Sequence, residues 1–487
     1  MRTYRPLLAL RLVLGGVCCL MVVSCTTRSV LRFEKFSGAT QKGDYASTIA
    51  AIKKQPKLYG NNNRFLYDMD IGMLYHYAGM YDSSAAYLLK ASRTYEDLFT
   101  RSATNEGASL LINDNVRPYR SKPYELTLLH QILQFDFFAT GQPDEALVEG
   151  RSMQLLFNEW ERKNAKDNHY FTNGMFHYVT SMIYDEQGQT DDAMISLYKA
   201  VQAFQRGPVE LPPAIAAYSS CMLQKNNRVA DAEKLNIKTL SVAKKTDKGL
   251  ENEQTEIVVI GYAGKGPALV ENEWWGDWVK DGLLVLHHSD HGHEEETMTF
   301  PAPGLPDREY EKAGKGQKTA SGTTLFIKVA LPKVKTFSSQ TAYFTVEGDM
   351  VATPVSTYII EDLDKQAEKQ LEDAMPSIVA RTVVRVATRT IAAQEAKKRM
   401  ETDSPIANLL ISIGTDVLSS QLEKADTRAC FFVPKTIQIA RIPVNPGVHT
   451  ITVTARDQSG NALGEKTFPA IEVRTHKKQF VFFSCFK

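Results

Sequence analysis

Apolar side chains follow two different periods in the two halves of this 487-residue chain. Up to about residue 240 they recur at i, i+3, i+4 and i+7, which places them on one stripe of a helix. From residue 257 onward they alternate or form short apolar runs, as in Thr436–Ile442 and His449–Ala455, a pattern typical of strands. The patterning therefore predicts an α + β multidomain protein, with helices first and a β-rich domain after them.

The β-rich region, residues 257–487, also contains two helical patterns, near 361–400 and 405–424. Between residues 378 and 400 the β-branched residues also fit a strand. Within the first, Arg381, Arg385 and Arg389 recur at four-residue intervals beside an apolar stripe that includes Val379 and Val383. Such a face either meets anionic lipid or packs on the sheet. The turn at 446–447 and the strand after it resemble hairpins of small extracytoplasmic β-sandwich domains, so we expect a sandwich-like domain with inserted helices.

A spaced motif repeats through the helical half. An aromatic residue is followed by Gly four positions later, then by a small residue, a large apolar residue and Ala. The copies are Tyr75, Gly79, Ser84, Leu88, Ala91; Phe137, Gly141, Ala146; and Tyr184, Gly188, Ala193, Leu197, Ala200, with partial copies at Gly43 and at Asn227, Ala232. The spacing resembles the tetratricopeptide repeat, a helix–turn–helix unit. We predict a TPR-like array over residues 35–240, with an unrelated antiparallel bundle as the alternative, and a solvated linker at 241–256.

The amino terminus resembles a bacterial lipoprotein signal. Arg2 and Arg5 precede an apolar run that is too short for a comfortable transmembrane helix and that ends in Val-Val-Ser-Cys at Cys25. We predict a signal peptide at residues 1–24 and a lipidated tether at 25–34. Several acyl chains on Cys25 would give stable anchoring. The alternatives are an ordinary signal peptide or an uncleaved anchor. Thr26 carries no inner-membrane retention cue, so the resemblance implies the outer membrane, facing the periplasm.

Removal of the signal changes the charge and cysteine counts. The full chain has 57 basic and 56 acidic residues, and residues 1–24 contain three arginines, so the mature chain carries 54 and 56. A net charge of −2 argues against a nucleic-acid surface. Beyond Cys25 only Cys221, Cys430 and Cys485 remain. Cys430 and Cys485 either form a bridge or are buried free thiols.

Several segments extend the resemblance beyond the signal. They are Asn113–Glu125, Leu128–His130, Ala146–Arg151, Phe171–Gly174 and Thr436–Arg441. With the lipid signal and the repeats, they resemble a family of bacterial lipoproteins of unassigned activity that carry tetratricopeptide repeats and a C-terminal β-rich domain. The resemblance implies display in the cell envelope, and it implies no reaction.

The insertion before the third repeat copy supplies candidate binding residues. Aromatic, basic and acidic side chains in a concave helical repeat suit peptide recognition. The candidates are Tyr119, Tyr124, Glu125, His130, Glu149 and Arg151. The alternative is a hydrogen-bond network between repeats that determines the curvature of the array.

Two clusters in the second half suggest other ligands. Trp274, Trp275 and Trp278 could stack on a glycan, contact lipid, or fill a core. Four of the ten histidines, His287, His288, His291 and His293, lie within seven residues. Imidazoles can ligate transition metals, but we expect no dedicated metal site and no cofactor.

Nucleophile elbow, zinc-protease and phosphate-loop patterns are missing from the sequence. The sequence therefore predicts a lipid-anchored extracytoplasmic adaptor that is not an enzyme. Its TPR-like array would bind another envelope protein or peptide. The alternative is a cell-wall or glycan binder that uses the tryptophan cluster. The sequence indicates no oligomeric state.

Overall fold

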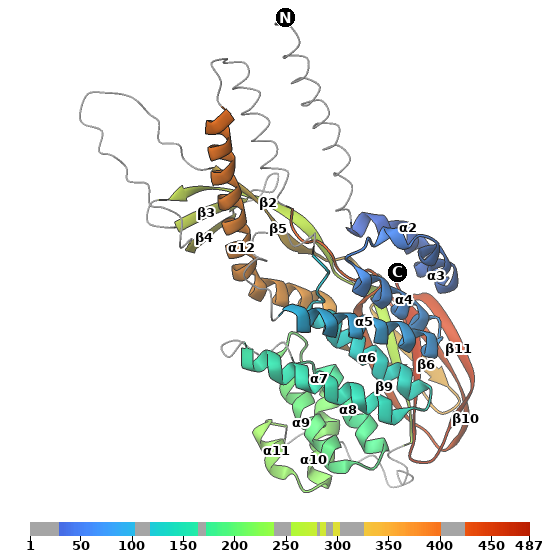
Figure 1. The fold of residues 1–487 in the computed structure, drawn as a ribbon. Coiled ribbons are helices and arrows are strands. Elements are labelled where there is room, and N and C mark those ends of the chain that lie inside the picture. The colour runs from blue at the N-terminus through green and yellow to red at the C-terminus, as the bar shows by residue number, and fades with distance from the viewer. Residues whose placement is uncertain are drawn as a thin grey trace, which may run out of the picture.

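The computed structural model describes residues 29–102, 117–163, 172–237, 255–279, 283–288, 296–301, 326–400 and 424–487. Within these residues the protein is mixed α and β, with helices first and strands after them (Figure 1). The predicted order of elements is therefore confirmed. The helices run in pairs, namely α2 (Ser29–Gln41) with α3 (Tyr45–Lys54), α4 (Arg64–Tyr77) with α5 (Tyr81–Ser102), α6 (Pro123–Ala139) with α7 (Pro143–Lys163), α8 (Gly174–Glu186) with α9 (Thr190–Arg206), and α10 (Pro213–Lys225) with α11 (Val229–Lys234).

Each helix pair turns at a residue that the motif identifies. Gly43, Gly79, Gly141 and Gly188 adopt φ between 71° and 76°, and Asn227 adopts φ of 58°. This left-handed region favours glycine and tolerates asparagine, and it ends one helix so that the next can reverse direction. A single-turn 3₁₀ helix, η1 (Pro56–Leu58), separates the first two pairs.

The strands of the described residues form three four-stranded sheets. The central sheet has the order β12-β1-β9-β8, the outer sheet β11-β10-β6-β7 and the distal sheet β4-β3-β2-β5. Their bounds are β1 (Glu256–Lys265), β2 (Ala268–Val279), β3 (Leu283–His288), β4 (Glu296–Pro301), β5 (Phe326–Lys335), β6 (Tyr343–Gly348), β7 (Val355–Ser356), β8 (Tyr358–Asp362), β9 (Pro434–Pro443), β10 (Gly447–Arg456), β11 (Ala462–Val473) and β12 (Lys478–Cys485).

The central sheet is buried on both faces. Val258, Ile260 and Tyr262 of β1 share one hydrophobic core with the helices, whereas Ile257 and Val259 face the core of the outer sheet. Strands buried on both faces read as continuous apolar runs, which explains the Ile257–Ile260 sequence. The helical and β-rich regions, predicted as separate domains, therefore share a core within the described residues.

Helices α4, α6 and α8 contact the central sheet on one side, and the outer helices α5, α7 and α9 pack against them. Residues 124–136 of α6 are all buried, because α5 and α7 cover one side and β12 and α12 (Leu363–Met400) contact another. A helix that is buried all round has no clear amphipathic stripe. This packing unites segments that are far apart in the sequence (Figure 1).

The predicted helix near 361–400 is confirmed as α12, which contains Pro376. Val379 and Val383 pack with Trp274 and Leu286 of the distal sheet. Arg385 is buried beside Thr382, so this part of the arginine face packs within the chain. Arg389 has no described side chain, and the predicted helix at 405–424 lies almost wholly outside the described residues.

No helix among the described residues is both long and apolar enough to cross a membrane. Cys430 and Cys485 are free and buried in different cores, which matches the alternative of buried thiols. The signal peptide, Cys25 and the tether up to residue 28 lie outside the described residues, as does the linker up to residue 254.

Close helix packing at Gly72 gives a first prediction. A Cβ at Gly72 would lie 2.5 Å from Leu88 Cδ2 and 2.7 Å from its Cγ. Gly72→Ala should lower the free energy of unfolding by about 1–3 kcal/mol, because α4 and α5 must separate or Leu88 must leave its rotamer. Gly38→Ala is the matched control, since its Cβ meets nothing within 4 Å and alanine favours helix. Urea unfolding measures both, and equal stability of the two variants would contradict the prediction.

Candidate functional site

Two buried carboxylates of the helical array hold an extended segment of the C-terminal region. Asp70 Oδ1 accepts the amides of Phe431 and Phe432 at 2.9 and 3.2 Å. Glu125 Oε1 accepts the amide of Cys430 at 2.9 Å. Three consecutive amides are thus satisfied by carboxylates from α4 and α6. We call residues 428–432, held in this way, the clamped segment.

Basic side chains complete the hold on the clamped segment. Lys122 Nζ donates to the carbonyl of Arg428 at 2.6 Å. Arg428 Nη1 donates to Asn63 Oδ1 at 2.9 Å and to the carbonyl of Arg117 at 2.8 Å. Buried polar groups are costly when unpaired. These contacts pair the polar groups on the inner side of the helical array with groups of the same chain.

Burial raises the pKa values of two groups at the clamped segment. Burial raises the pKa of Asp70 to about 7, although the amides of Phe432 and Phe431 and the hydroxyl of Tyr59 lower it in part. Burial and the carboxylate of Glu125 raise the pKa of the Cys430 thiol well above its ordinary value. A thiol with a raised pKa forms little thiolate and is a poor nucleophile, so Cys430 acts as a core residue.

Further polar contacts join the array to the central sheet. His76 on α4 lies 2.6 Å from Asp136 Oδ1 on α6 and 2.7 Å from Tyr262 Oη on β1. Arg441 on β9 donates to the hydroxyl of Tyr178 on α8 at 2.8 Å and, within the sheet, to both oxygens of Glu256 at 2.7 and 2.8 Å. All these side chains lie in the interior or are largely buried, so they attach the layers and are closed to a substrate.

A second carboxyl group with a raised pKa lies between α8 and the central sheet. Glu361 at the end of β8 accepts from Asn173 Nδ2 at 2.8 Å, and Gln366 donates to it from α12. Burial raises the pKa of Glu361 to about 8, although Asn173 lowers it in part. Like Asp70, this group therefore holds a proton more readily in the folded protein than in the unfolded chain.

The structure divides the predicted protein-binding residues into three groups. Tyr119, Tyr124 and Glu125 are buried at the clamped segment, where the Tyr119 hydroxyl donates to Glu125 and the Tyr124 amide donates to Gln370 of α12. The other three lie elsewhere: His130 and Glu149 form a buried pair at 2.6 Å between α6 and α7, and Arg151 is exposed. In the described structure, only Arg151 of the six presents an exposed side chain.

The tryptophans do not form one ring platform. Trp274 on β2 is buried against Val329, Val379 and Leu286, which matches the core alternative. Adjacent strand residues point to opposite faces, so Trp275 lies on the other face. The side chain of Trp278 lies outside the described residues.

The histidine cluster is only half described. His287 and His288 lie on β3, whereas His291 and His293 lie outside the described residues. The ring of His288 lies 5.1 Å from that of Trp274, and its Nδ1 is 2.8 Å from the carbonyl oxygen of Glu273. Among the described residues, no three His, Cys, Asp or Glu side chains are grouped to hold a metal ion.

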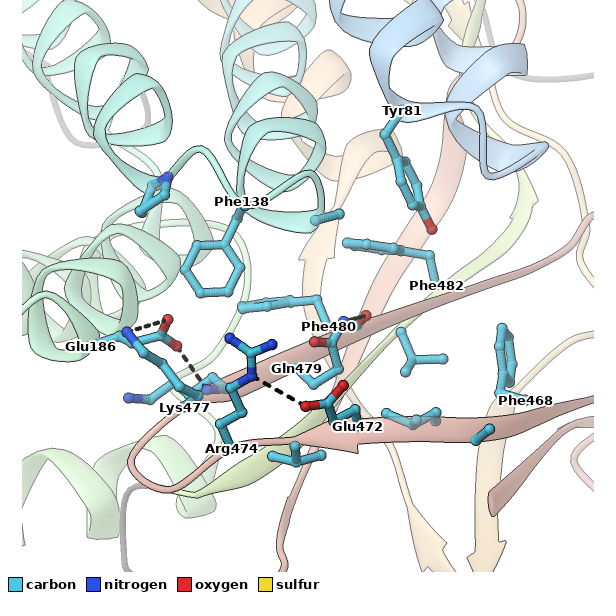
Figure 2. A pocket seen from close by; sticks show the side chains of 18 of the residues that line it. Tyr81, Phe138, Glu186, Phe468, Glu472, Arg474, Lys477, Gln479, Phe480 and Phe482 are labelled. Carbon is cyan, nitrogen blue, oxygen red and sulfur yellow. Dashed lines mark hydrogen bonds and ion pairs between the residues drawn. The ribbon is translucent and has the colours of Figure 1, made fainter. Parts of the chain in front are cut away.

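A groove of about 840 Å³ lies where the array meets strands β11 and β12 (Figure 2). Aromatic rings line it from three directions: Phe138 from α6, Phe480 and Phe482 from β12, and Phe468 from β11. At one end Lys477 pairs with Glu186 at 3.4 Å and Arg474 pairs with Glu472 at 3.2 Å. Clefts of this volume commonly hold ligands, so the groove is the candidate functional site.

No protein-family model matches this chain, and no curated protein matches it.

Sequence reasoning identified Glu125 as a candidate binding residue, but it did not identify Asp70 or the groove. A signal for Asp70 exists, because Asp70 interrupts the apolar helical run Phe65–Leu74. Charged residues in such positions are seldom buried unless they are paired. The groove has no comparable signal, since its residues come from helix ends and from two strands that only tertiary packing brings together.

The raised pKa of Asp70 predicts a pH-dependent stability. Between pH 4 and 7 the folded protein holds a proton that the unfolded chain has released, so the free energy of unfolding falls as pH rises through this window. Asp70→Asn removes this contribution. The fall between pH 5 and pH 8 should then be smaller by on the order of 2 kcal/mol, as measured by urea unfolding at both pH values.

Asp97→Asn is the matched control, because Asp97 is exposed on α5. It should leave the pH dependence of the wild-type protein unchanged. Glu361 titrates in both variants, so its contribution cancels in the comparison. An Asp70→Asn variant with the same pH dependence as wild type would show that Asp70 has an ordinary pKa.

Proposed function

We propose that the protein is a lipid-anchored scaffold of the cell envelope that binds another protein and catalyses no reaction. The groove carries the proposal. It lies at the junction of helices and strands, and it is lined by aromatic and basic side chains, types that are enriched in protein interfaces. The lipid on Cys25, at the outer membrane facing the periplasm, would hold this groove near the membrane.

The turn geometry supports a tetratricopeptide-like array. Five helix pairs turn at residues with positive φ, and four of these residues are the glycines of the motif. The face-to-face packing of the central and outer sheets supports a sandwich-like module. The array and this module share a core, so a bound partner would be held by a single rigid body.

The clamped segment occupies the inner side of the helical array, so the partner is assigned to another surface. The residues expected to bind a peptide include Tyr119, Tyr124 and Glu125, yet these are engaged within the same chain. Glu125 accepts the amide of Cys430, the Tyr119 hydroxyl donates to Glu125, and the Tyr124 amide donates to α12. The partner is therefore assigned to the groove at the turn ends of the helix pairs. The glycan alternative requires stacked rings, and the burial of Trp274 favours its role in the core.

Cross-linking in cells tests the scaffold function. A photoreactive amino acid in place of Gln479, which lines the groove, should capture one reproducible envelope protein. The same amino acid in place of Lys57, which is exposed on η1 and does not line the groove, should not. Mass spectrometry identifies the product, and recovery of glycan strands alone would contradict the proposal.

The anchor is tested separately. Cys25→Ser should abolish labelling by a fatty-acid analogue and move the protein from the membrane to the soluble envelope fraction, because no acyl chain remains. Cys221→Ser, at a half-buried cysteine of α10, should keep both the label and the location. Retention of the label in Cys25→Ser would show that the anchor lies elsewhere.

A further inference from the structure

Strand β12 has an unpaired edge that faces the groove. It pairs in parallel with β1, and no other described strand pairs with it. The amide of Glu256 donates to the carbonyl of Lys477, whereas the amide of Lys478 points the other way, to Glu186. Because backbone groups alternate in direction along a strand, the N–H and C=O groups of Phe480 and Phe482 point away from β1.

The space beside this edge has apolar walls on both sides. Phe480 and Phe482 face the helices, where Phe138 and Tyr81 also line the groove. On the other side lie Phe468 and Ile471 of β11, which pack against the core of the outer sheet. An added strand would lie about 4.8 Å from β12, and its alternate side chains would contact the two walls in turn (Figure 2).

The neighbouring edge, β11, is protected in ways that β12 is not. Its pairing with β10 is irregular opposite residues 449–451, and it carries Pro469 and Ala470, the latter with φ of 55°. Bulges and prolines commonly prevent the pairing of exposed edge strands. In β12 the register with β1 is continuous from residue 478 to 485, without proline. The chain therefore blocks one edge of the groove and leaves the other open.

The charges of the groove favour an acidic occupant. Four basic residues line it, Lys466, Arg474, Lys477 and Lys478, against two acidic ones, Glu186 and Glu472. Lys478 is buried and paired with Asp185, and Lys477 pairs with Glu186. Arg474 pairs with Glu472, but its side chain is 79% exposed, and Lys466 is exposed as well. Complementary charge guides association and register, so acidic residues at the ends of a bound segment would meet Arg474 and Lys466.

We propose that the groove binds an extended peptide segment of a partner protein, which adds as a strand to the free edge of β12. The segment has apolar side chains on both faces and acidic residues at its ends. Main-chain hydrogen bonds to Phe480 and Phe482 provide the pairing, as in other cases of strand addition. This proposal rests on the scaffold function above and specifies the chemistry of its partner.

Binding of a designed peptide to the full chain in detergent tests the proposal. The probe is a capped, fluorescent nine-residue peptide of valine and threonine with two aspartates at each end. Fluorescence anisotropy should detect binding, and hydrogen exchange at the amides of Phe480 and Phe482 should slow. The amides of Gln479 and Val481, which point toward β1, should change less.

Two modified peptides separate main-chain pairing from other contacts. A peptide N-methylated at alternate central residues keeps its side chains but loses the N–H groups of one edge, so its affinity should fall at least tenfold. A peptide with lysines at the ends should also bind more weakly. Equal binding of the N-methylated and parent peptides would overturn strand addition, and so would the absence of binding by the parent peptide.

Protein variants locate the binding. Arg474→Glu should weaken binding of the acidic peptide about threefold to fivefold, whereas Lys57→Glu, the same charge change outside the groove, should not. Gln479→Ala should strengthen binding, because the Gln479 side chain donates to the carbonyl of Phe480 at 3.4 Å and competes with the peptide. Equal effects of the two charge reversals would overturn the assignment to the groove.

The outcomes distinguish this inference from the scaffold function. If Gln479 cross-links to one protein in cells but the peptide fails to bind, the scaffold function holds and strand addition is wrong. If the peptide binds as predicted but no protein is captured, strand addition holds and the scaffold function fails. A concentration-dependent dimer in sedimentation that the peptide dissociates would assign the edge to a second copy and overturn the partner peptide.

Discussion

Helix α6 can be stable only when it is covered on every side, and the rest of the structure follows from that constraint. Residues 124–136 are buried without a break, and they include the polar side chains Glu125, His130 and Asp136. Apolar groups there need neighbours, and the polar groups need hydrogen-bond partners because no water reaches them. Outer helices, the central sheet and the clamped segment supply both, so the helical array and the strands fold against each other.

This arrangement gives the array an internal ligand. The carboxylates of Asp70 and Glu125 accept amides of residues 430–432, in the way that a helical repeat holds an extended peptide. In the proposed function, the surface for an external partner is the groove at the helix turns, beside the edge of β12 with which no other described strand pairs. The proposed scaffold would therefore present one rigid surface to its partner.

Much of the order of helices and strands can be predicted from the sequence. The helical period, the turn residues Gly43, Gly79, Gly141 and Gly188, and the apolar run of β1 correspond to described elements. The strand β12 was visible only as an apolar run, and its parallel pairing with β1 joins residues more than two hundred positions apart. Periodicity reports the face that a residue buries but not the element that covers it, so it indicates the helical and β-rich regions but not the core that they share.

The sequence by itself determined the types and order of the elements, the turns between paired helices and the chemistry of the candidate side chains. These features depend on backbone preferences and on periodicity, which act over a few residues. Tertiary structure alone decided that Glu125 faces the amide of Cys430, that Trp274 is a core residue and that β12 is an edge strand among the described strands. Each of these depends on contacts between distant segments, whose geometry is established only when the whole core packs.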